Sequence, residues 1–147
     1  MFGCPDATEE QIEEALVISQ AKEFVDTKEG RLDAVVEQGG KNLSGGQRQR
    51  LTLARALVPQ SDILIMDDSA SALDYATDAK LRKAIQNMKR KPTVFIVSQR
   101  TSSIQDADSI LVLDDGKIAG KGTHEELIAS CDIYREIYET QFKKEEA

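Results

Sequence analysis

The sequence SGGQ at residues 44–47 places two glycines directly after a serine, at the start of a helix-forming run rich in arginine. The first turn of a helix exposes unpaired backbone N–H groups and carries partial positive charge, so it attracts anions. Gly45 and Gly46 lack the side chains that would hold a phosphate away, and Ser44 and Gln47 add side-chain donors. These residues predict a phosphate-binding helix end. The alternative is a loop before an ordinary helix, because short motifs also arise by chance.

Two adjacent carboxylates, Asp67 and Asp68, follow the apolar run ILIM at residues 63–66. In α/β proteins the carboxyl end of a buried strand opens into the crevice where ligands bind, and Mg²⁺ prefers oxygen ligands there. We predict that Asp67 orients Mg²⁺ through its water shell and that Asp68 acts as a general base on an attacking water. The alternative is that the strand simply emerges into solvent at this point.

Three apolar runs predict the strands that position these groups, at Asp62–Asp68, Thr93–Ser98 and Ser109–Gly116. Each run is continuous rather than alternating, which is typical of strands buried on both faces of a parallel sheet. A helical stripe precedes the second run, and residues 114–122 predict a tight turn into an antiparallel edge strand. The pattern indicates an α/β domain.

Three capping boxes predict helix starts, and the last helix carries an apolar stripe. The boxes pair Thr8 with Gln11, Ser44 with Gln47, and Thr123 with Glu126. The stripe consists of Ile133, Tyr134, Ile137, Tyr138 and Phe142, of which we interpret Tyr134 and Tyr138 as core packing.

Composition excludes several classes of function. The chain has 147 residues and a net charge of −7, which argues against a nucleic-acid partner held by charge. No apolar run reaches membrane-spanning length and no secretion signal is apparent, so we expect a soluble chain. Cys4 and Cys131 lack metal-binding spacing and are expected to be unpaired thiols.

In their order along the chain these motifs resemble the nucleotide-binding domain of ABC transporters. LSGGQ and RQRLTLARAL at residues 43–57 are followed by ILIMDD, SALD at residues 71–74, and FIVSQR at residues 95–100. The resemblance implies a P-loop NTPase-type, mostly parallel sheet with flanking helices, present in part. It divides the chain into a helical subdomain (about 1–58), a segment with the Walker B strand, D-loop and switch (about 59–122), and C-terminal helices (about 123–147).

The resemblance also implies partners and cofactors. Two such domains sandwich two ATP molecules with Mg²⁺, and the signature residues Ser44–Gln47 contact the γ-phosphate of ATP held by the partner. The D-loop, which links the two sites, corresponds to Ser71, Ala72, Leu73 and Asp74. Residues 35–40 and 115–128 resemble segments of exporters, whose transmembrane part places these domains at the cytoplasmic side of the plasma membrane.

Three departures from the family pattern change the expected activity. No G-x-x-x-x-G-K-[ST] sequence occurs in the chain, so the half of the domain with the P-loop is expected to be missing. Asp68 stands where the family usually has Glu, and Gln99 stands at the switch position, where the family usually has His. The shorter carboxylate and the non-ionising amide both predict slow hydrolysis. We therefore expect an ATPase domain from the degenerate half of a heterodimeric exporter, inactive as an isolated chain.

Two other functions stay open from sequence. One is a soluble ABC-type ATPase of DNA maintenance or translation, and the other is a non-catalytic interaction module. A sheet face left uncovered by the missing strands also predicts self-association. We expect a solvated or capping role for His124, a mixture of salt bridges and partner contacts for Arg48, Arg50 and Arg55, and turn positions for Asp114 and Asp115.

Overall fold

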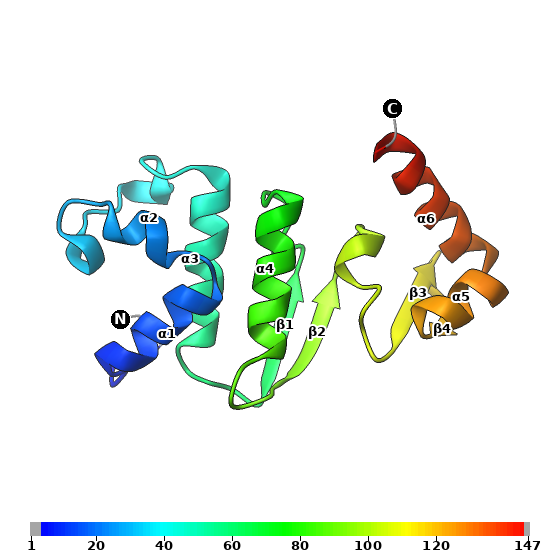
Figure 1. Cartoon of the computed structure of the whole chain (residues 1–147), viewed down its shortest axis with the longest axis horizontal. Coiled ribbons are helices and arrows are strands. Elements are labelled where there is room, and N and C mark those ends of the chain that lie inside the picture. The colour runs from blue at the N-terminus through cyan, green and yellow to red at the C-terminus, as the bar shows by residue number, and fades with distance from the viewer. Residues whose placement is uncertain (1–3, 146–147) are drawn as a thin grey trace. The chain divides into compact units, whose positions relative to one another are not determined.

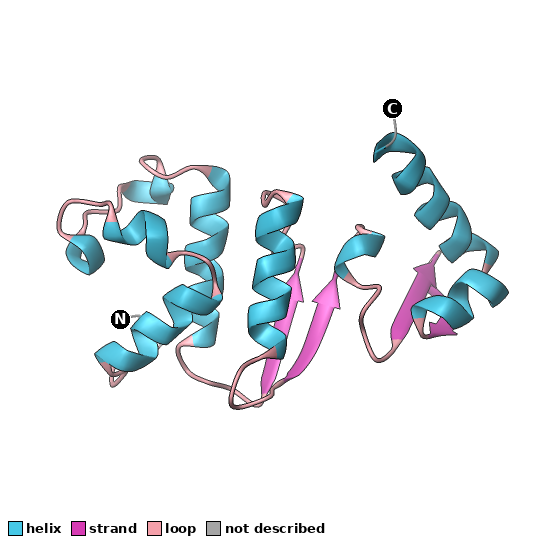
Figure 2. Cartoon of the chain, viewed as in Figure 1, coloured by secondary structure: helices cyan, strands magenta, loops and turns pink. Residues whose placement is uncertain are grey.

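The computed structural model describes residues 4–145. The chain folds as two compact units, the first ending at Val97 and the second beginning at Ser98. Figure 1 labels their helices and strands, and Figure 2 separates them by type. Each unit has its own hydrophobic core, so each is described by itself below.

Three helices form the N-terminal part of the first unit. Two of them, α1 (Glu9–Ile18) and α3 (Gly45–Leu57), begin at predicted capping boxes in which both reciprocal bonds form. Between them lie α2 (Lys22–Asp26), which the sequence did not predict, and the 3₁₀ turns η1 (Arg31–Asp33) and η2 (Gln38–Gly40). The apolar faces of α1 and α3 pack together through Ala15, Leu16, Leu53, Ala54 and Leu57.

A parallel strand pair completes the first unit. The strands β1 (Ile63–Asp67) and β2 (Thr93–Val97) pair in register, and α4 (Tyr75–Gln86) connects them. The crossover through a helix is the arrangement expected for parallel strands. Leu64 and Met66 join the core that also holds Leu81 of α4.

The other face of this strand pair is uncovered, which corrects the prediction of strands buried on both faces. Burial alternates along β1 instead of being continuous. Ile63, Ile65, Phe95 and Val97 each expose more than half of their surface. The apolar pattern is continuous, but within the described residues of the first unit, 4–97, no element covers that face. The uncovered face itself was expected from the sequence.

The second unit is a hairpin packed against two helices. The strands β3 (Ile110–Asp114) and β4 (Lys117–Gly122) pair antiparallel, as predicted, but they do not extend the parallel sheet as its edge. Asp115 and Gly116 form the turn with positive φ of 45° and 71°, values that suit Asp and Gly. Among the described residues β3 pairs only with β4, so the two sheets are separate two-stranded sheets.

The helices of this unit are α5 (His124–Ser130) and α6 (Asp132–Glu145), and the turn η3 (Thr101–Ser103) precedes the hairpin. The third predicted capping box forms at Thr123. Tyr134 is 2% exposed and lies in the core with Leu127 and Cys131, which confirms its predicted packing role.

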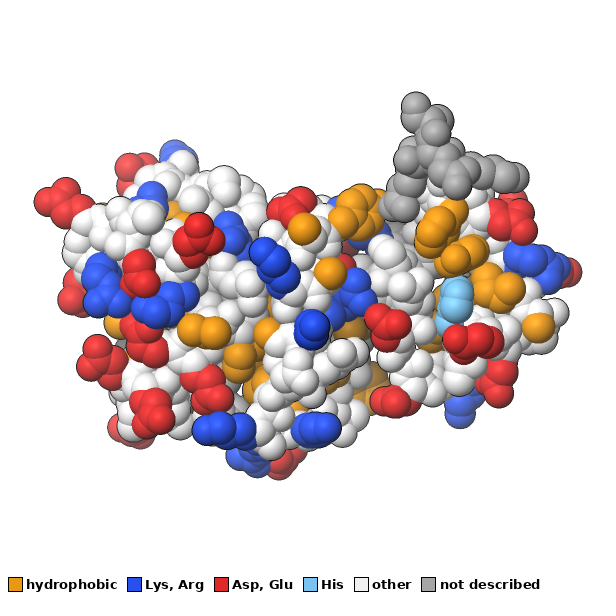
Figure 3. Space-filling view, viewed as in Figure 1, with side chains coloured by type: hydrophobic (Ala, Val, Ile, Leu, Met, Phe, Trp, Pro, Cys, Tyr) orange, Lys and Arg blue, Asp and Glu red, His pale blue; other side chains and the backbone are white. Residues whose placement is uncertain are grey.

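Two further sequence expectations concern the whole described chain. Cys4 and Cys131 are both free thiols, as predicted. No helix within residues 4–145 is long and apolar enough to cross a membrane. On the face of the first unit shown in Figure 3, acidic side chains gather over α1 and basic side chains lie over α4.

Candidate functional site

The N-terminus of α3 is open to solvent. Ser44 is exposed, and Gly45, Gly46 and Gln47 are half-buried. The Gln47 N–H donates to Ser44 Oγ at 3.2 Å, and the Ser44 N–H donates to Gln47 Oε1 at 3.0 Å. Both bonds use side-chain oxygens as acceptors, so they do not consume the Ser44 hydroxyl hydrogen or the Gln47 amide hydrogens. The capped tip therefore keeps its side-chain donors for an anion.

The two glycines of the tip have different neighbours. A Cβ on Gly46 would lie 3.1 Å from the Ala72 carbonyl oxygen, whereas one on Gly45 would lie 3.6 Å from the Ala72 Cβ. The first contact is too close for most side chains, and the second is an ordinary van der Waals contact. Gly46 thus lets α3 pack against the loop that follows β1, a role that the sequence did not reveal. Gly45 has no such packing requirement.

The two carboxylates lie at the carboxyl end of β1, and both residues are exposed. Asp67 is the last residue of the strand and pairs with Val97 of β2. The Asp68 N–H continues the pairing by donating to the Val97 carbonyl at 3.0 Å. Asp68 then turns the chain away with φ of 47°, a left-handed conformation that Asp tolerates better than most residues.

Gln49, which the sequence did not single out, joins α3 to this turn. Its Nε2 donates to the Asp68 carbonyl at 3.1 Å and to Ser71 Oγ at 2.9 Å. Its Oε1 accepts from the Ala72 N–H at 2.9 Å. One carboxamide therefore holds both ends of the turn. No local sequence signal could have shown these contacts, because they join residues about twenty positions apart in the chain.

The segment Ser71–Asp74 leads from this turn into α4. Leu73 is 5% exposed and anchors the segment in the core. Asp74 caps α4, accepting from the Thr77 N–H at 2.9 Å and the Thr77 hydroxyl at 2.8 Å. Those bonds, the backbone one foremost, lower the pKa of the Asp74 carboxyl below its ordinary value. Ser71 and Ala72 lie exposed between these two anchors.

Gln99 lies in the second unit, in the short segment before η3, and it is exposed. Its backbone carbonyl accepts from Gln141 Nε2 of α6 at 2.6 Å. Gln141 Oε1 in turn accepts from the Thr101 N–H at 2.9 Å and the Thr101 hydroxyl at 3.0 Å. The bond from Gln141 engages only the Gln99 backbone carbonyl, so the side-chain amide of Gln99 is left to other contacts.

Comparison with known proteins gives these groups a context. The family model described as "ABC transporter" matches residues 6–71. The chain is 42% identical over 139 residues to an ATP-dependent lipid A-core flippase from Shewanella frigidimarina, covering 95% of this chain and 23% of the flippase. It is 41% identical over 145 residues to a β-(1→2)glucan export ATP-binding/permease protein from Rhodopseudomonas palustris, covering 99% of this chain and 24% of that protein.

A solved structure agrees with these relatives. The chain matches a bacterial Atm1-family ABC exporter with ATP bound at a TM-score of 0.90, with 31% identity, over 95% of this chain and 25% of the other. The chain belongs to the ABC transporter family. It spans about a quarter of the length of the relatives that it matches.

The carboxylates after β1 are the candidates for holding a metal ion in this ABC transporter chain. Among the described residues no group of three or more His, Cys, Asp or Glu could hold a metal ion. Mg²⁺ is usually held by one or two carboxylates together with substrate phosphates and waters. The exposed pair Asp67 and Asp68 fits such a shared site rather than an all-protein cage.

The salt-bridge part of the prediction for Arg48 and Arg50 needs correction, while their predicted partner contacts stay predictions. Arg48 donates to the Gly40 and Leu43 carbonyls, at 3.3 and 2.8 Å, rather than to carboxylates. Arg50 donates to the Gln20 carbonyl at 2.8 Å, and its guanidinium lies 4.8 Å from the centre of the Phe24 ring. Both side chains therefore tie α3 to the preceding loops, where backbone carbonyls need donors. The prediction for Arg55 stays untested.

The prediction of a solvated or capping role for His124 is also wrong. The ring is half-buried, and Nδ1 lies 2.9 Å from the Tyr134 hydroxyl oxygen. It packs against Tyr138 at 5.0 Å between ring centres. In Figure 3 the one histidine side chain of the chain, in pale blue, borders hydrophobic side chains. Burial raises the pKa of the Tyr134 hydroxyl, which keeps it protonated. Asp114 and Asp115 lie at the hairpin turn, as predicted.

Proposed function

We propose that this chain serves as part of the ATP-binding motor of an ABC exporter, an ATPase that couples ATP binding and hydrolysis to transport. In this proposal it pairs with a second nucleotide-binding domain and contacts a transmembrane domain, at the cytoplasmic side of the plasma membrane. The predicted division into about 1–58, 59–122 and 123–147 describes its helical, Walker B to switch, and C-terminal parts. The export functions in the relatives' names favour transport over DNA maintenance, translation or a purely structural interaction.

The observation that carries the proposal is the open tip of α3. Ser44 and Gln47 keep donor hydrogens there, and Gly45 leaves room for a phosphate near the first N–H groups. No P-loop sequence lies in the chain to hold ATP on this side. We therefore assign Ser44, Gly45, Gly46 and Gln47 to the γ-phosphate of ATP seated on the partner.

The carboxylates at the end of β1 support the proposed role in ATP hydrolysis. Mg²⁺, when bound with ATP, supplies positive charge to the phosphates. Asp67 would hold that ion through water at the strand end, and Asp68 would accept a proton from the attacking water. The Ser71–Asp74 segment carries the state of one site to the other.

The residues at the two reaction positions predict slow hydrolysis. Asp68 has a carboxylate one methylene shorter than the Glu that the family pattern carries, and a shift of about 1 Å can cost on the order of a hundredfold in rate. Gln99 can hydrogen-bond a γ-phosphate oxygen but cannot carry charge at neutral pH. We propose that the partner is a different subunit with Glu and His at these positions.

Two binding experiments test the proposal. In calorimetric titration of the 147-residue chain with Mg-ATP we expect no micromolar binding. When a P-loop-bearing ABC domain with an intact Glu is added, we expect the two to associate only with Mg-ATP present. Micromolar binding by the chain alone, or association independent of nucleotide, would contradict the proposal. Self-association of the chain through its uncovered sheet face is checked in the same samples by sedimentation.

A further inference from the structure

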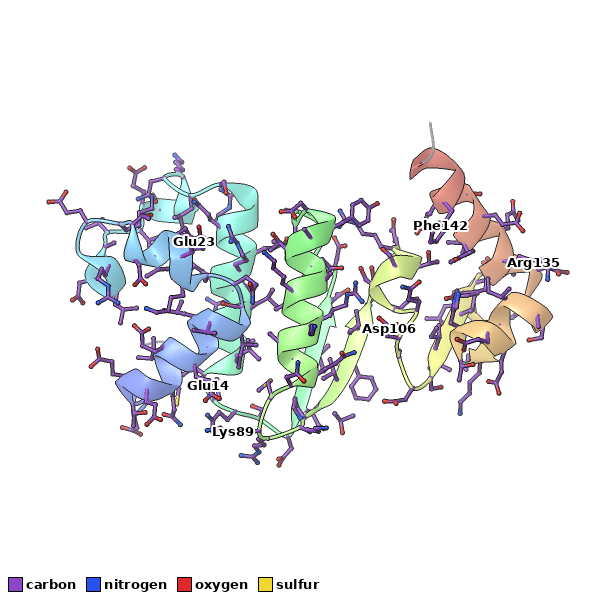
Figure 4. The ribbon with its side chains drawn as sticks, in the orientation of Figure 1. Glu14, Glu23, Lys89, Asp106, Arg135 and Phe142 are labelled. Carbon is purple, nitrogen blue, oxygen red and sulfur yellow. The ribbon has the colours of Figure 1, made fainter. Side chains whose placement is uncertain are left out.

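The turn that carries Gln99 is held from a distance by one side chain of α6. Gln141 lies 42 positions after Gln99 and 40 positions after Thr101, and it contacts both. Figure 4 labels its neighbour Phe142 on α6 and Asp106 just after the turn η3, which locate the two elements. The contact lies wholly within the second unit.

The bonding is two-sided. Gln141 Nε2 donates to the Gln99 carbonyl at 2.6 Å, and Gln141 Oε1 accepts from the Thr101 N–H at 2.9 Å and the Thr101 hydroxyl at 3.0 Å. A carboxamide offers both a donor and an acceptor, so one side chain makes both kinds of bond. Thr101 is 2% exposed, so water has little access to its polar groups if Gln141 is removed.

We call the bonds of Gln141 to Gln99 and Thr101 the clamp. The clamp fixes the backbone on both sides of Arg100, next to the exposed side chain of Gln99. We infer that Gln141 is a positioning residue for the switch: it sets where Gln99 presents its amide, and through this contact α6 acts on hydrolysis. The inference rests on the proposed role of Gln99 at the γ-phosphate. It adds to that role a residue of the C-terminal helix that touches no substrate.

The first test measures the clamp in the chain itself. Hydrogen exchange of the Thr101 amide is compared in wild type, Gln141→Ala and Gln141→Glu. We expect Gln141→Ala to speed exchange about tenfold, because the amide loses its acceptor. Gln141→Glu keeps an acceptor for Thr101 but sets an oxygen against the Gln99 carbonyl, so exchange should rise less.

The matched control is Thr140→Ala, one position earlier on α6. The Thr140 hydroxyl bonds only to the Glu136 carbonyl of its own helix in the contacts of the described residues. Thr140→Ala should leave Thr101 exchange within about twofold of wild type. Equal exchange in Gln141→Ala and wild type would overturn the clamp.

The second test measures whether the clamp acts through Gln99. With the partner subunit's own ATP site inactivated, so that only the site of Asp68 and Gln99 is measured, ATP turnover of the assembled transporter is compared for Gln141→Ala, Gln99→Ala and the double variant. We expect Gln141→Ala to lower kcat about tenfold with little change in KM, and to have no further effect when Gln99 is already Ala. An equal fall in both backgrounds would show a general effect on folding and would overturn the inference.

The two tests separate failure of the inference from failure of the proposed function. If Gln99→Ala leaves turnover unchanged, the proposed role of Gln99 is wrong, and the link from α6 to hydrolysis falls with it. If Gln99→Ala lowers turnover but Gln141→Ala does not, Gln99 keeps its role and only the inference is overturned.

Discussion

The loops that follow β1 and β2 are held in the same way by different parts of the chain. In each, a glutamine Nε2 donates to the backbone carbonyl of the candidate site residue, Asp68 or Gln99. In each, the Oε1 of the same glutamine accepts from an N–H further along, at Ala72 or Thr101. The bonds of Gln49 thus form a second clamp, and each clamp fixes the loop that carries an exposed side chain just after a strand.

The helices that supply the clamps differ in what else they carry. Gln49 comes from α3, whose tip is the proposed contact for the partner's ATP. Gln141 comes from α6, which carries no proposed substrate contact. The loop of Asp68 is therefore tied to the helix whose tip is the proposed phosphate contact, whereas the loop of Gln99 is tied to the C-terminal helix. If the proposed roles hold, we expect the two positions to respond to different parts of the molecule.

The largest effect that we expect concerns the tip of α3, which lies near the loop after β1 and has no counterpart among the described residues at the loop after β2. Gly45→Asp places a negative charge at the proposed phosphate position, and partner-site turnover should fall on the order of a hundredfold. Acidic side chains favour a helix N-terminus, so the free energy of unfolding should stay equal or rise by about 0.3–1 kcal/mol. Gly45→Ala is the control and should retain most turnover. An equal loss in both variants would indicate a backbone effect instead of phosphate repulsion.

The second prediction concerns Asp68 and Gln99, the two residues whose backbone carbonyls the glutamines bind. Asp68→Glu together with Gln99→His should raise ATP turnover at the site of these two residues, measured with the partner subunit's own site inactivated, by on the order of 10- to 100-fold, because a longer carboxylate and an imidazole suit the reaction better. Asp68→Glu alone should lower the free energy of unfolding by less than about 1 kcal/mol, since φ at this position is left-handed. Turnover that stays flat in the double variant would refute the degenerate-site proposal.

The third prediction compares the clamps by stability. Gln49→Ala removes three hydrogen bonds at the β1 turn and should lower the free energy of unfolding by about 1–2 kcal/mol in urea titration. Thr52→Ala is the control on the same helix, because its hydroxyl bonds to the Arg48 carbonyl of α3, and it should change stability by less than about 0.5 kcal/mol. Similar losses in both variants would mean that Gln49 contributes only as a helix residue.

The smallest effect concerns the helix caps and their response to pH. Asp74 caps α4 with a carboxylate whose pKa is lowered, whereas Ser44 and Thr123 cap their helices with hydroxyls. The Asp74 contribution to stability is complete above its unfolded pKa and is lost as pH falls through the lower, folded pKa. Asp74→Ser should therefore lose less stability than wild type between pH 5 and about pH 2, as measured by urea titration.

Another carboxylate titrates in the same range, and the comparison with wild type removes its effect. Lys22 foremost, and then Arg31, lower the pKa of Asp26 through hydrogen bonds, and both variants retain this group. Identical pH profiles for wild type and Asp74→Ser would show that the ionised cap does not matter.

Local patterns predicted much of this fold. All three capping boxes form, and the strands fall within the predicted ranges. These features depend on residues within four or five positions of each other, so the sequence displays them directly. The roles of Asp67, Asp68, Gln99 and the signature residues stay predictions, although the structure brings the α3 tip, Asp68 and Ala72 together in one unit.

What the sequence could not predict depends on distant contacts. Gln49 and Gln141 are ordinary surface glutamines by sequence, and only the folded chain shows what they reach. Burial of the strands was overestimated for the same reason, because an apolar run does not reveal whether another element covers it. The partners of Arg48, Arg50 and His124 were likewise set by neighbouring loops and helices.

The separation of the two sheets has a consequence for the order of folding. The β3–β4 hairpin closes through the short turn at Asp115 and Gly116, and hairpins of this kind form in about 1–10 μs. Ile63 of β1 meets Thr93 of β2 only after the intervening helix has brought distant chain segments together, which carries a larger loop-closure entropy. During refolding of the full chain we therefore expect β1 to acquire its partner late, with the carboxylates at its end reaching their final places after the hairpin is complete.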